Sequence, residues 1–292
     1  MYFFKSAITL VLAGLSAVQA YDSEKFSTRY NLTQAQFQQD FNKFVGAGYR
    51  LNYVTSAYAS NATYHGVLYA SIWEKRASPP WTARTGLTSA QYAVVFSQLR
   101  SQGYHPVVLN GYNLNGSLRY DTIWEKSPVR AWEQRRDMTT AQFNANNDRL
   151  KARGYRLTHI SAYSIGSGVG AEARYAAIWE QKQSVEWFVK LAESDIDPAG
   201  RDRANSLLRA KGYKMVQLST TIVGIKRSTS SIWEKGLGHG WLDQYALQAQ
   251  RMEEIDEWYY GSIQVPRTIS AVQLGKRVLY SGLWEDANYF PL

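Results

Sequence analysis

Apolar and polar residues follow one pattern that repeats along the chain, and it predicts a helix near the start of each copy. In the first copy, Thr33 is placed to cap the helix, Gln36 to complete a capping box, and Leu32 to pack on Phe37 as a hydrophobic staple. The next copies repeat these residue types, and a fourth uses aspartate followed by proline at the first helical position. The further predicted caps are Thr88, Thr139 and Asp197.

Two strands are predicted after each helix. Gly48 lies 15 residues after the Thr33 cap (48 − 33), where a left-handed glycine suits a helix end. Tyr49 then opens a β-like run, a polar loop follows, and a second run leads to Trp73. Because length differences between copies fall in the loop, we expect β-hairpins of unequal length. The equivalent glycines are Gly48, Gly103, Gly154 and Gly212.

The second strand of each copy ends in an Ile/Leu-Trp-Glu triplet. Successive triplets are 51, 55, 54 and 51 residues apart, which is typical of a tandem repeat. A ring of carboxylates for acid–base chemistry is one interpretation, but glycoside hydrolysis needs two carboxylates in unlike environments. Five equivalent copies favour structural tryptophans and glutamates paired with Lys or Arg. These residues are Trp73, Glu74, Trp124, Glu125, Trp179, Glu180, Trp233, Glu234, Trp284 and Glu285.

A second column of tryptophans lies eight residues after the first four triplets. In two copies arginines such as Arg84 and Arg135 lie nearby, so these rings are predicted to be partly exposed and able to stack on a cation or a ligand. Phe26 occupies the same place before the first helix. The candidate binding residues are Trp81, Trp132, Trp187 and Trp241.

The copies predict an α+β fold of five helix plus β-hairpin tandem repeats. One helix and one hairpin cannot bury their own apolar face, so we expect a single repeat domain over residues 21–292. Its helices should pack against one shared, curved antiparallel sheet with a half-barrel-like outline. The expected units are 21–76, 77–127, 128–182, 183–235 and 236–292.

Residues 1–20 have the features of a secretory signal peptide. Lys5 precedes an apolar stretch, and Val18 and Ala20 place small residues before the expected cleavage site. No later segment predicts a membrane span. We therefore expect a secreted, extracellular protein, which must fold without disulfides because it has no cysteine. N-glycosylation sequons begin at Asn31, Asn61 and Asn115.

The sequence contains no recognisable catalytic motif. It has no Ser-x-x-Lys, no Gly-x-Ser-x-Gly and no His-Glu-x-x-His, and its four histidines do not pair at metal-ligand spacing. We therefore expect no enzyme activity, no cofactor and no metal site. The formal net charge is +9, but acidic residues are interspersed with basic ones. This favours a soluble surface, and we expect no nucleic-acid partner.

The Trp-Glu, Gly-Tyr and Thr-x-Ala-Gln elements resemble the tandem structural repeat of the N-terminal domain of secreted fungal polyglycine hydrolases. The resemblance covers essentially the whole chain after residue 20. In those hydrolases a separate β-lactamase-like domain holds the Ser-x-x-Lys nucleophile. Because this sequence lacks that motif, the resemblance implies the repeat architecture and not the hydrolase chemistry.

Three functions remain open from the sequence. The first is a secreted, non-catalytic module that binds an extracellular protein or glycan. The second is an accessory domain of a serine hydrolase whose catalytic domain is absent from this sequence. The third is a glycan-binding module that uses its exposed aromatic rings. The pattern specifies neither the ligand nor the oligomeric state.

Overall fold

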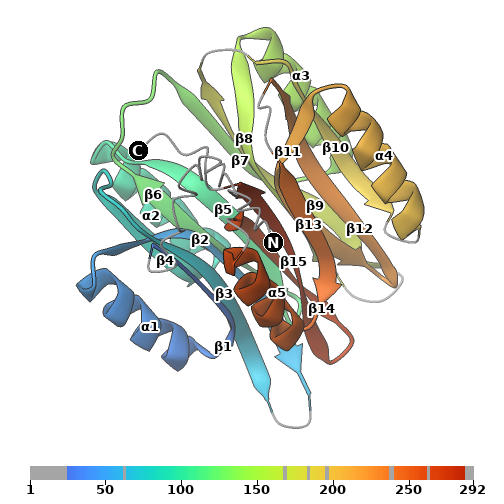
Figure 1. Cartoon of the computed structure of the whole chain (residues 1–292). Coiled ribbons are helices and arrows are strands. Elements are labelled where there is room, and N and C mark those ends of the chain that lie inside the picture. Colours follow the sequence, from blue (N-terminus) through green and yellow to red (C-terminus); the bar gives the residue numbers. More distant parts are fainter. Residues whose placement is uncertain are drawn as a thin grey trace, which may run out of the picture.

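The computed structural model describes residues 25–286 except 62–63, 167–169, 183–184, 195–196, 237–239 and 262–263. These residues form units of strand, helix, strand, strand (Figure 1). The elements are β1 (Phe26–Leu32), α1 (Gln34–Gly46), β2 (Tyr49–Ser60), β3 (His65–Lys75), β4 (Trp81–Leu87), α2 (Ser89–Ser101), β5 (His105–Leu114), β6 (Ser117–Glu125), β7 (Trp132–Met138), α3 (Thr140–Ala152), β8 (Tyr155–Ile165), β9 (Glu172–Gln181), β10 (Trp187–Ser194), α4 (Pro198–Ala210), β11 (Tyr213–Val223), β12 (Lys226–Lys235), β13 (Trp241–Leu247), α5 (Ala249–Gly261), β14 (Gln264–Leu274) and β15 (Arg277–Asp286).

The predicted signal peptide at 1–20 lies outside the described residues. Within the described part of the chain, no helix is both long and apolar enough to cross a bilayer.

The helices begin where the capping residues predict. Thr33 accepts a hydrogen bond from the backbone of Gln36, whose side chain reaches back to the cap, and units 2 and 3 form the same capping box. Asp197 caps α4, with proline in its first turn. The glycine after each of these four helices has a φ between 78° and 82°, so the left-handed helix end is confirmed.

Each unit has three strands, so the expected helix plus hairpin is one strand short. In unit 1, β3 lies between β1 and β2, and both pairings are antiparallel. The additional strand precedes the helix, begins at Phe26 in unit 1, and begins at the downstream tryptophan in the other units. The pattern of apolar residues does not predict this strand. In β7, for example, only Trp132 and Met138, at the two ends, are apolar.

A β-bulge interrupts the pairing of each first strand near its end. In unit 1 the register shifts between Arg29 and Leu32, and Asn31 between them has a left-handed φ of 57°. The bulge breaks the ladder and redirects the chain into the helix cap. The left-handed bulge residues are Asn31, Gly86, Asp137, Ala192 and Ala246.

The five sheets are arranged in a cycle. Strand β2 packs against β5, β5 against β8, β8 against β11, β11 against β14, and β14 against β2. Each sheet keeps its own three strands, so the expectation of one continuous sheet is wrong, and the half-barrel outline is not confirmed. We call the line around which these five inner strands meet the axis. In Figure 1, α1, α3 and α4 lie at the outside of the molecule.

Side chains on the inner strands connect neighbouring units near the axis. The backbone N–H of Gly111 donates to Ser161 Oγ, that of Ala162 to Ser219 Oγ, and that of Thr220 to Ser270 Oγ. These bonds satisfy backbone groups on strand edges that no ladder covers. They repeat from unit to unit, so they act as rungs of the cycle.

A buried polar group fills the axis beside these rungs. Gln217 Nε2 donates to His159 Nδ1 at 2.8 Å and lies 3.4 Å from the Tyr53 hydroxyl, which joins units 4, 3 and 1. His159 Nε2 donates to the carbonyl of Leu109 at 3.1 Å. All three side chains are buried. The axis is therefore closed at this level rather than open as a channel.

The seam between units 5 and 1 uses a different contact. Asp256 of α5 accepts hydrogen bonds from Thr28 Oγ1 at 2.5 Å and from the Trp284 indole at 2.7 Å. The Tyr280 hydroxyl accepts from the backbone N–H of the Asn31 bulge. Unit 5 thus holds the first strand of unit 1, and the two ends of the repeat array meet.

Candidate binding site

The downstream tryptophans begin the first strands of units 2 to 5 and face the helix of the preceding unit. Trp81 lies 5.9 Å from Phe41 of α1, and Trp132 lies 5.8 Å from Phe96 of α2, between ring centroids. Trp81 and Trp132 are half-buried, whereas Trp187 and Trp241 are buried. The four rings are therefore equivalent in position but differ in exposure.

A basic side chain covers three of these four rings. Arg100 lies 5.6 Å from the centroid of Trp132, Lys151 lies 4.6 Å from Trp187, and Arg209 lies 4.6 Å from Trp241. Lys151 also donates to the carbonyl of Trp187 at 2.9 Å, and Arg209 to that of Trp241 at 3.1 Å. Cation–π attraction and these hydrogen bonds hold the basic side chain over the ring.

Valine replaces the basic residue over Trp81. Arg100, Lys151 and Arg209 each lie 12 residues after their helix cap, and the same position in α1 is Val45. Val45 is 43% exposed, and its short side chain has no charge to place over the indole. The first seam of the cycle is therefore the one that leaves its tryptophan without a basic cover.

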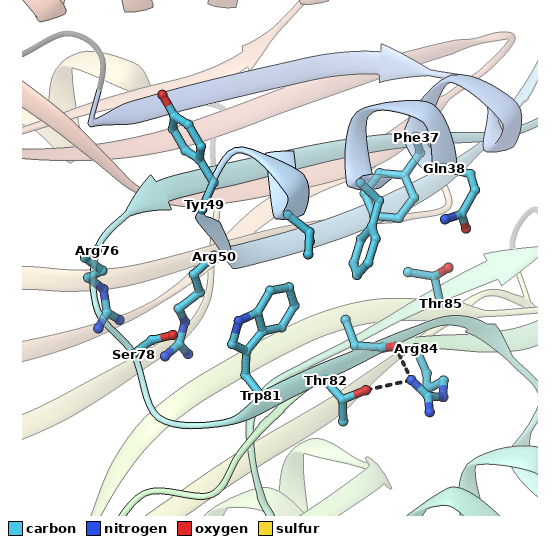
Figure 2. A pocket seen from close by; sticks show the side chains of 14 residues that line it. Phe37, Gln38, Tyr49, Arg50, Arg76, Ser78, Trp81, Thr82, Arg84 and Thr85 are labelled. Carbon is cyan, nitrogen blue, oxygen red and sulfur yellow. Dashed lines mark hydrogen bonds between the residues drawn. The ribbon is translucent and has the colours of Figure 1, made fainter. Parts of the chain in front are cut away.

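A groove of about 670 Å³ lies at this seam, between α1 and β4. Trp81 projects from β4 toward the helix, with Arg50 and Arg76 on one side and Arg84 on the other (Figure 2). Phe37 and Phe41 of α1 add apolar surface. The volume is within the range of ligand sites in proteins, roughly 300–1,000 Å³.

The charge of the groove is one-sided. Among its described lining residues there are three arginines and no Asp or Glu. Arg84 donates to Thr82 Oγ1 and to the carbonyl of Ala83, both at 2.7 Å, so its guanidinium is held on the surface of β4. Arg50 and Arg76 pair with Glu125 and Glu74, which are not among the lining residues. Stacking surface and hydrogen-bond donors thus lie together, without a carboxylate that would favour a cation.

The equivalent hollow at the third seam is smaller and closed differently. It measures about 240 Å³ and is lined by Lys151, Lys182, Glu186 and the edge of Trp187. At this third seam the Lys151 side chain occupies the position over the ring that is open at Trp81. The two seams therefore share a scaffold and differ in access to the aromatic ring.

The comparison with known proteins agrees with the repeat. A family model described as "Polyglycine hydrolase-like, structural repeat" matches residues 23–76, 78–127 and 129–182. The chain belongs to this repeat family. The resemblance drawn from the Trp-Glu and Gly-Tyr elements is thereby confirmed, and the structure shows the same unit twice more, in β10–β12 and β13–β15.

The triplet tryptophans of the polyglycine hydrolase-like repeat lie in the core. All five are 0% exposed. Trp73 stacks on Phe44 of α1 with 5.1 Å between centroids and donates its indole N–H to Ser71. Trp179 donates instead to Asn147 of α3. The helix of each unit thus fills the space beside the triplet ring, which leaves no room there for a ligand.

The triplet glutamates all have cationic partners. Arg50 pairs with Glu125, Arg156 with Glu234, and Lys214 with Glu285, at 2.9, 3.2 and 3.1 Å. In each case the cation belongs to one unit and the glutamate to the next. Glu74 and Glu180 pair within their own units, with Arg76 and Lys182. Burial raises the pKa of Glu234, and the adjacent Arg156 opposes that shift.

Other titratable groups are buried but dispersed. Burial lowers the pKa of His159 to about 4 and raises those of Asp121 and Asp256 to about 6. None of the three lines the Trp81 groove. Of the remaining histidines, His65 is exposed, His105 is buried, and His239 lies outside the described residues. In the described part of the chain, no group of three or more His, Asp or Glu residues could hold a metal ion.

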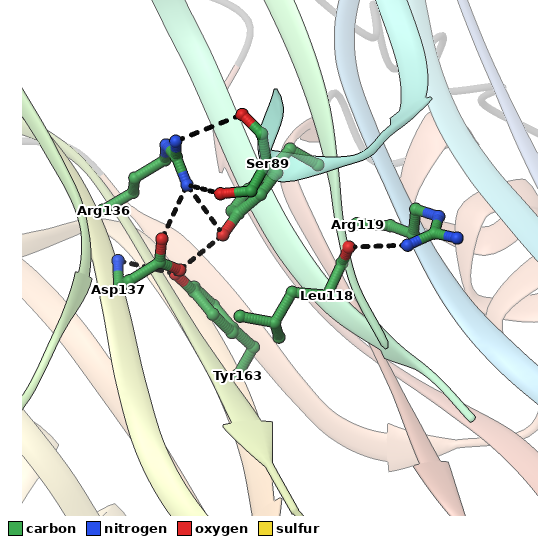
Figure 3. Close-up of polar contacts among 7 residues, drawn as sticks. Ser89, Leu118, Arg119, Arg136, Asp137 and Tyr163 are labelled. Carbon is green, nitrogen blue, oxygen red and sulfur yellow. Dashed lines mark hydrogen bonds and ion pairs between the residues drawn. The ribbon is translucent and has the colours of Figure 1, made fainter. Parts of the chain in front are cut away.

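The charged residues that follow Trp132 in the sequence belong to a polar cluster between units 2 and 3. Arg136 donates to Asp137 Oδ2 at 2.6 Å and to the Tyr120 hydroxyl at 3.1 Å (Figure 3). Tyr163 donates to Asp137 Oδ1, and the Asp137 backbone N–H donates back to Tyr163. Arg136 also reaches Ser89 of α2. The cluster fixes the bulge of β7, so these charges are accounted for by structure.

The sequon asparagines lie at turns. Asn31 occupies the bulge before α1 and is exposed. Asn115 is an exposed residue of the β5–β6 turn with a left-handed φ of 48°. Asn61 is half-exposed in the β2–β3 loop, and the next two residues of its sequon lie outside the described residues. Glycosylation at these positions stays a prediction.

Proposed function

We propose that this protein is a secreted, non-catalytic repeat module that binds an extracellular ligand in the Trp81 groove. The observation that supports the proposal is the replacement of a basic residue by Val45 at the seam where the Trp81 groove lies. The three other seams that have a downstream tryptophan show the same scaffold with the ring covered. The binding role of Trp132, Trp187 and Trp241 stays a prediction; Trp187 and Trp241 are buried, and Arg100 lies over Trp132.

The chemistry of the groove favours a glycan as the ligand. An indole face stacks on the apolar face of a sugar ring, and arginine and threonine side chains donate to hydroxyl or carboxylate oxygens. Because the described lining has three arginines and no carboxylate, an acidic sugar fits better than a cationic peptide. We therefore expect acidic oligosaccharides to bind more tightly than neutral ones.

Calorimetric titration with a panel of acidic and neutral oligosaccharides tests this function. Trp81→Ala should weaken binding at least about tenfold, equivalent to ~1.4 kcal/mol. Trp258→Ala is the matched control, because Trp258 is 69% exposed on α5, away from the groove. If no acidic oligosaccharide binds, or if the two variants behave alike, the groove is not the binding site.

The repeat supplies two reciprocal variants. Val45→Arg should place a guanidinium over Trp81, as Arg100 lies over Trp132, and should weaken ligand binding. Arg100→Val should uncover Trp132 and raise the measured stoichiometry from one site toward two. Both positions are on exposed helix faces, so neither change should disturb folding. Unchanged affinity for Val45→Arg would contradict the proposed role of the missing cover.

Secretion is part of the proposal and has its own test. The residue types in segment 1–20 support cleavage after Ala20. Expression of the full chain in a eukaryotic secretory host should release a protein whose first residue is Tyr21, measured by N-terminal sequencing. Retention of residues 1–20 in the released protein would contradict it.

An accessory role beside a serine hydrolase is a second candidate. The description of the matched family favours it, since that description refers to polyglycine hydrolases. Incubation of the purified chain with glycine-rich peptides tests whether the chain itself is catalytic. We expect no cleavage by the chain alone. Turnover that is abolished by one triplet Glu→Gln substitution would show that the module is itself an enzyme.

A further inference from the structure

A second pocket lies on the axis, at the end of the cycle where the five hairpins turn. It has a volume of about 370 Å³, and all five units contribute to its lining. Ala57, Gly111, Ala162, Thr221 and Ala271 come from the five inner strands in turn. A pocket that every repeat helps to build is a property of the closed cycle, and no single unit could form it.

The floor of the pocket is built from small residues and side-chain hydrogen bonds. The rungs at Ser161, Ser219 and Ser270 and the His159–Gln217 pair fill the axis next to it. Gly111 leaves room for the Tyr163 ring, because a Cβ there would lie 2.5 Å from that ring. The axis is therefore filled next to the pocket by side chains of the inner strands.

The lining is polar and uncharged. Its described side chains include the hydroxyls of Tyr58, Ser164 and Thr221 and the amides of Asn113 and Gln273, and none is Asp, Glu, Lys or Arg. The inner strands are edge strands of their sheets, and the rungs already use the backbone N–H groups of Gly111 and Ala162. The hydroxyl and amide side chains suit a neutral ligand with several hydrogen-bond donors and acceptors.

The rim adds apolar surface on one side. Ile225, in the turn of unit 4, is 94% exposed, and Leu274, at the turn of unit 5, is 44% exposed. Both adjoin lining residues, Gly224 and Gly275. A ligand with hydroxyls on its edge and an apolar C–H face matches such an entrance.

We infer that the axial pocket is a binding site for an uncharged sugar residue, distinct from the arginine-lined groove at Trp81. Its neutral lining separates it from that groove, and the inference does not depend on ligand binding at Trp81. Tyrosine, asparagine, serine and glycine on the tips of a rigid framework also provide the adaptable contacts found in binding loops. The framework is constant, while the tips differ in length and sequence between units.

Selective ¹⁵N-glycine labelling gives a direct test by NMR. Five glycines line the pocket: Gly111, Gly116, Gly166, Gly224 and Gly275. Two others follow helices at a distance from this pocket and from the Trp81 groove: Gly103 and Gly212. Titration with neutral mono- and disaccharides should shift the first group and leave the second unchanged. The titrations use a Ser117→Ala background, which removes the Asn115 sequon without altering a lining residue.

Two variants check that the shifts report the pocket. Ala271→Phe should fill it and abolish the shifts, and the double variant Ser164→Ala, Gln273→Ala should reduce affinity several-fold without changing packing. Trp81→Ala should leave the titration unchanged, so failure here is distinguishable from failure at the groove. Absence of shifts with every neutral sugar, or shifts with a short neutral peptide alone, would overturn the inference.

Discussion

The two ends of the axis are built on different principles. At the end where the triplets lie, Arg156–Glu234 and Lys214–Glu285 join one unit to the next, with each of these side chains no more than about a sixth exposed. At the hairpin end, the described lining of the pocket contains no charged side chain. One end is held by repeated ionic contacts, and the other presents neutral, variable turns.

The difference indicates how the repeat separates stability from recognition. Tryptophan, glutamate and capping residues recur at fixed spacing, and they bury the core or join neighbouring sheets. The turns have two residues between β11 and β12 and between β14 and β15, and more between β2 and β3 and between β8 and β9. Variation at the tips therefore leaves the inter-unit contacts intact.

The largest effect is expected from removing a triplet ring. Trp179→Ala should lower the free energy of unfolding by about 3–5 kcal/mol, because the ring is fully buried against Phe143 and its loss leaves a cavity. Urea unfolding followed by circular dichroism measures it. Trp258→Ala, at a 69% exposed position, should change stability by less than about 0.5 kcal/mol. Similar losses of stability for both variants would show that the triplet tryptophans do not form the core.

The buried His159–Gln217 pair, which lies between the two ends of the axis, should make the free energy of unfolding depend on pH. The folded pKa of His159 is lowered to about 4 from 6.5, so its contribution is fully present above pH 6.5 and is lost as the pH falls toward 4. Protonation would place an N–H at Nδ1 against the Gln217 amide. The loss should reach at most about 3 kcal/mol near pH 4.

Subtraction of a variant isolates this effect. Burial raises the pKa values of Asp121 and Asp256 to about 6. Their carboxylates therefore lower the free energy of unfolding as the pH rises from about 4 through 6, which is opposite in sign to the effect of His159. The difference in unfolding free energy between wild type and His159→Gln should therefore be measured from pH 4 to pH 7. A difference that does not change with pH would contradict the assignment.

Local signals in the sequence predict the helices and hairpins, but they do not predict the cycle. Caps such as Thr33 and glycines such as Gly48 act within a few residues, so the pattern is sufficient to place them. The first strands are not predicted from the pattern, and β7, for example, has few apolar positions. The pairing of β7 with β9 depends on residues 37 to 48 positions away, from Met138 with Tyr175 (175 − 138 = 37) to Trp132 with Glu180 (180 − 132 = 48).

The candidate sites could be predicted only in part, because they too depend on residues from different units. The sequence singles out Trp81 as one of four equivalent rings, and the distinguishing residue, Val45, lies on another unit's helix. Comparison of position 12 after each cap would have revealed it, since three copies have Arg or Lys there. The axial pocket has no such signal, because its residues come from five turns of ordinary composition and meet only when the cycle closes.

The ionic end should respond less strongly than the core. Glu234→Gln removes the partner of Arg156, whose side chain is 17% exposed, and should cost about 2 kcal/mol, since a mostly buried cation is left unpaired. Arg156→Met in the same background should recover part of the loss, measured as a double-mutant cycle. The exposed pair Lys235–Glu186 is the control, and Glu186→Gln should leave stability essentially unchanged. A coupling energy near zero for the first pair would mean that the ionic contacts do not hold the units together.

The smallest effect is expected at the hairpin turns. Ile225→Thr changes a side chain that is 94% exposed, so the free energy of unfolding should stay within about 0.5 kcal/mol of wild type. Leu218→Thr, on the same unit but fully buried, should cost several times more and serves as the matched comparison. Both are measured by urea unfolding under one set of conditions. If Ile225→Thr were as destabilising as Leu218→Thr, the turns would belong to the framework, and variation in them could not be free for recognition.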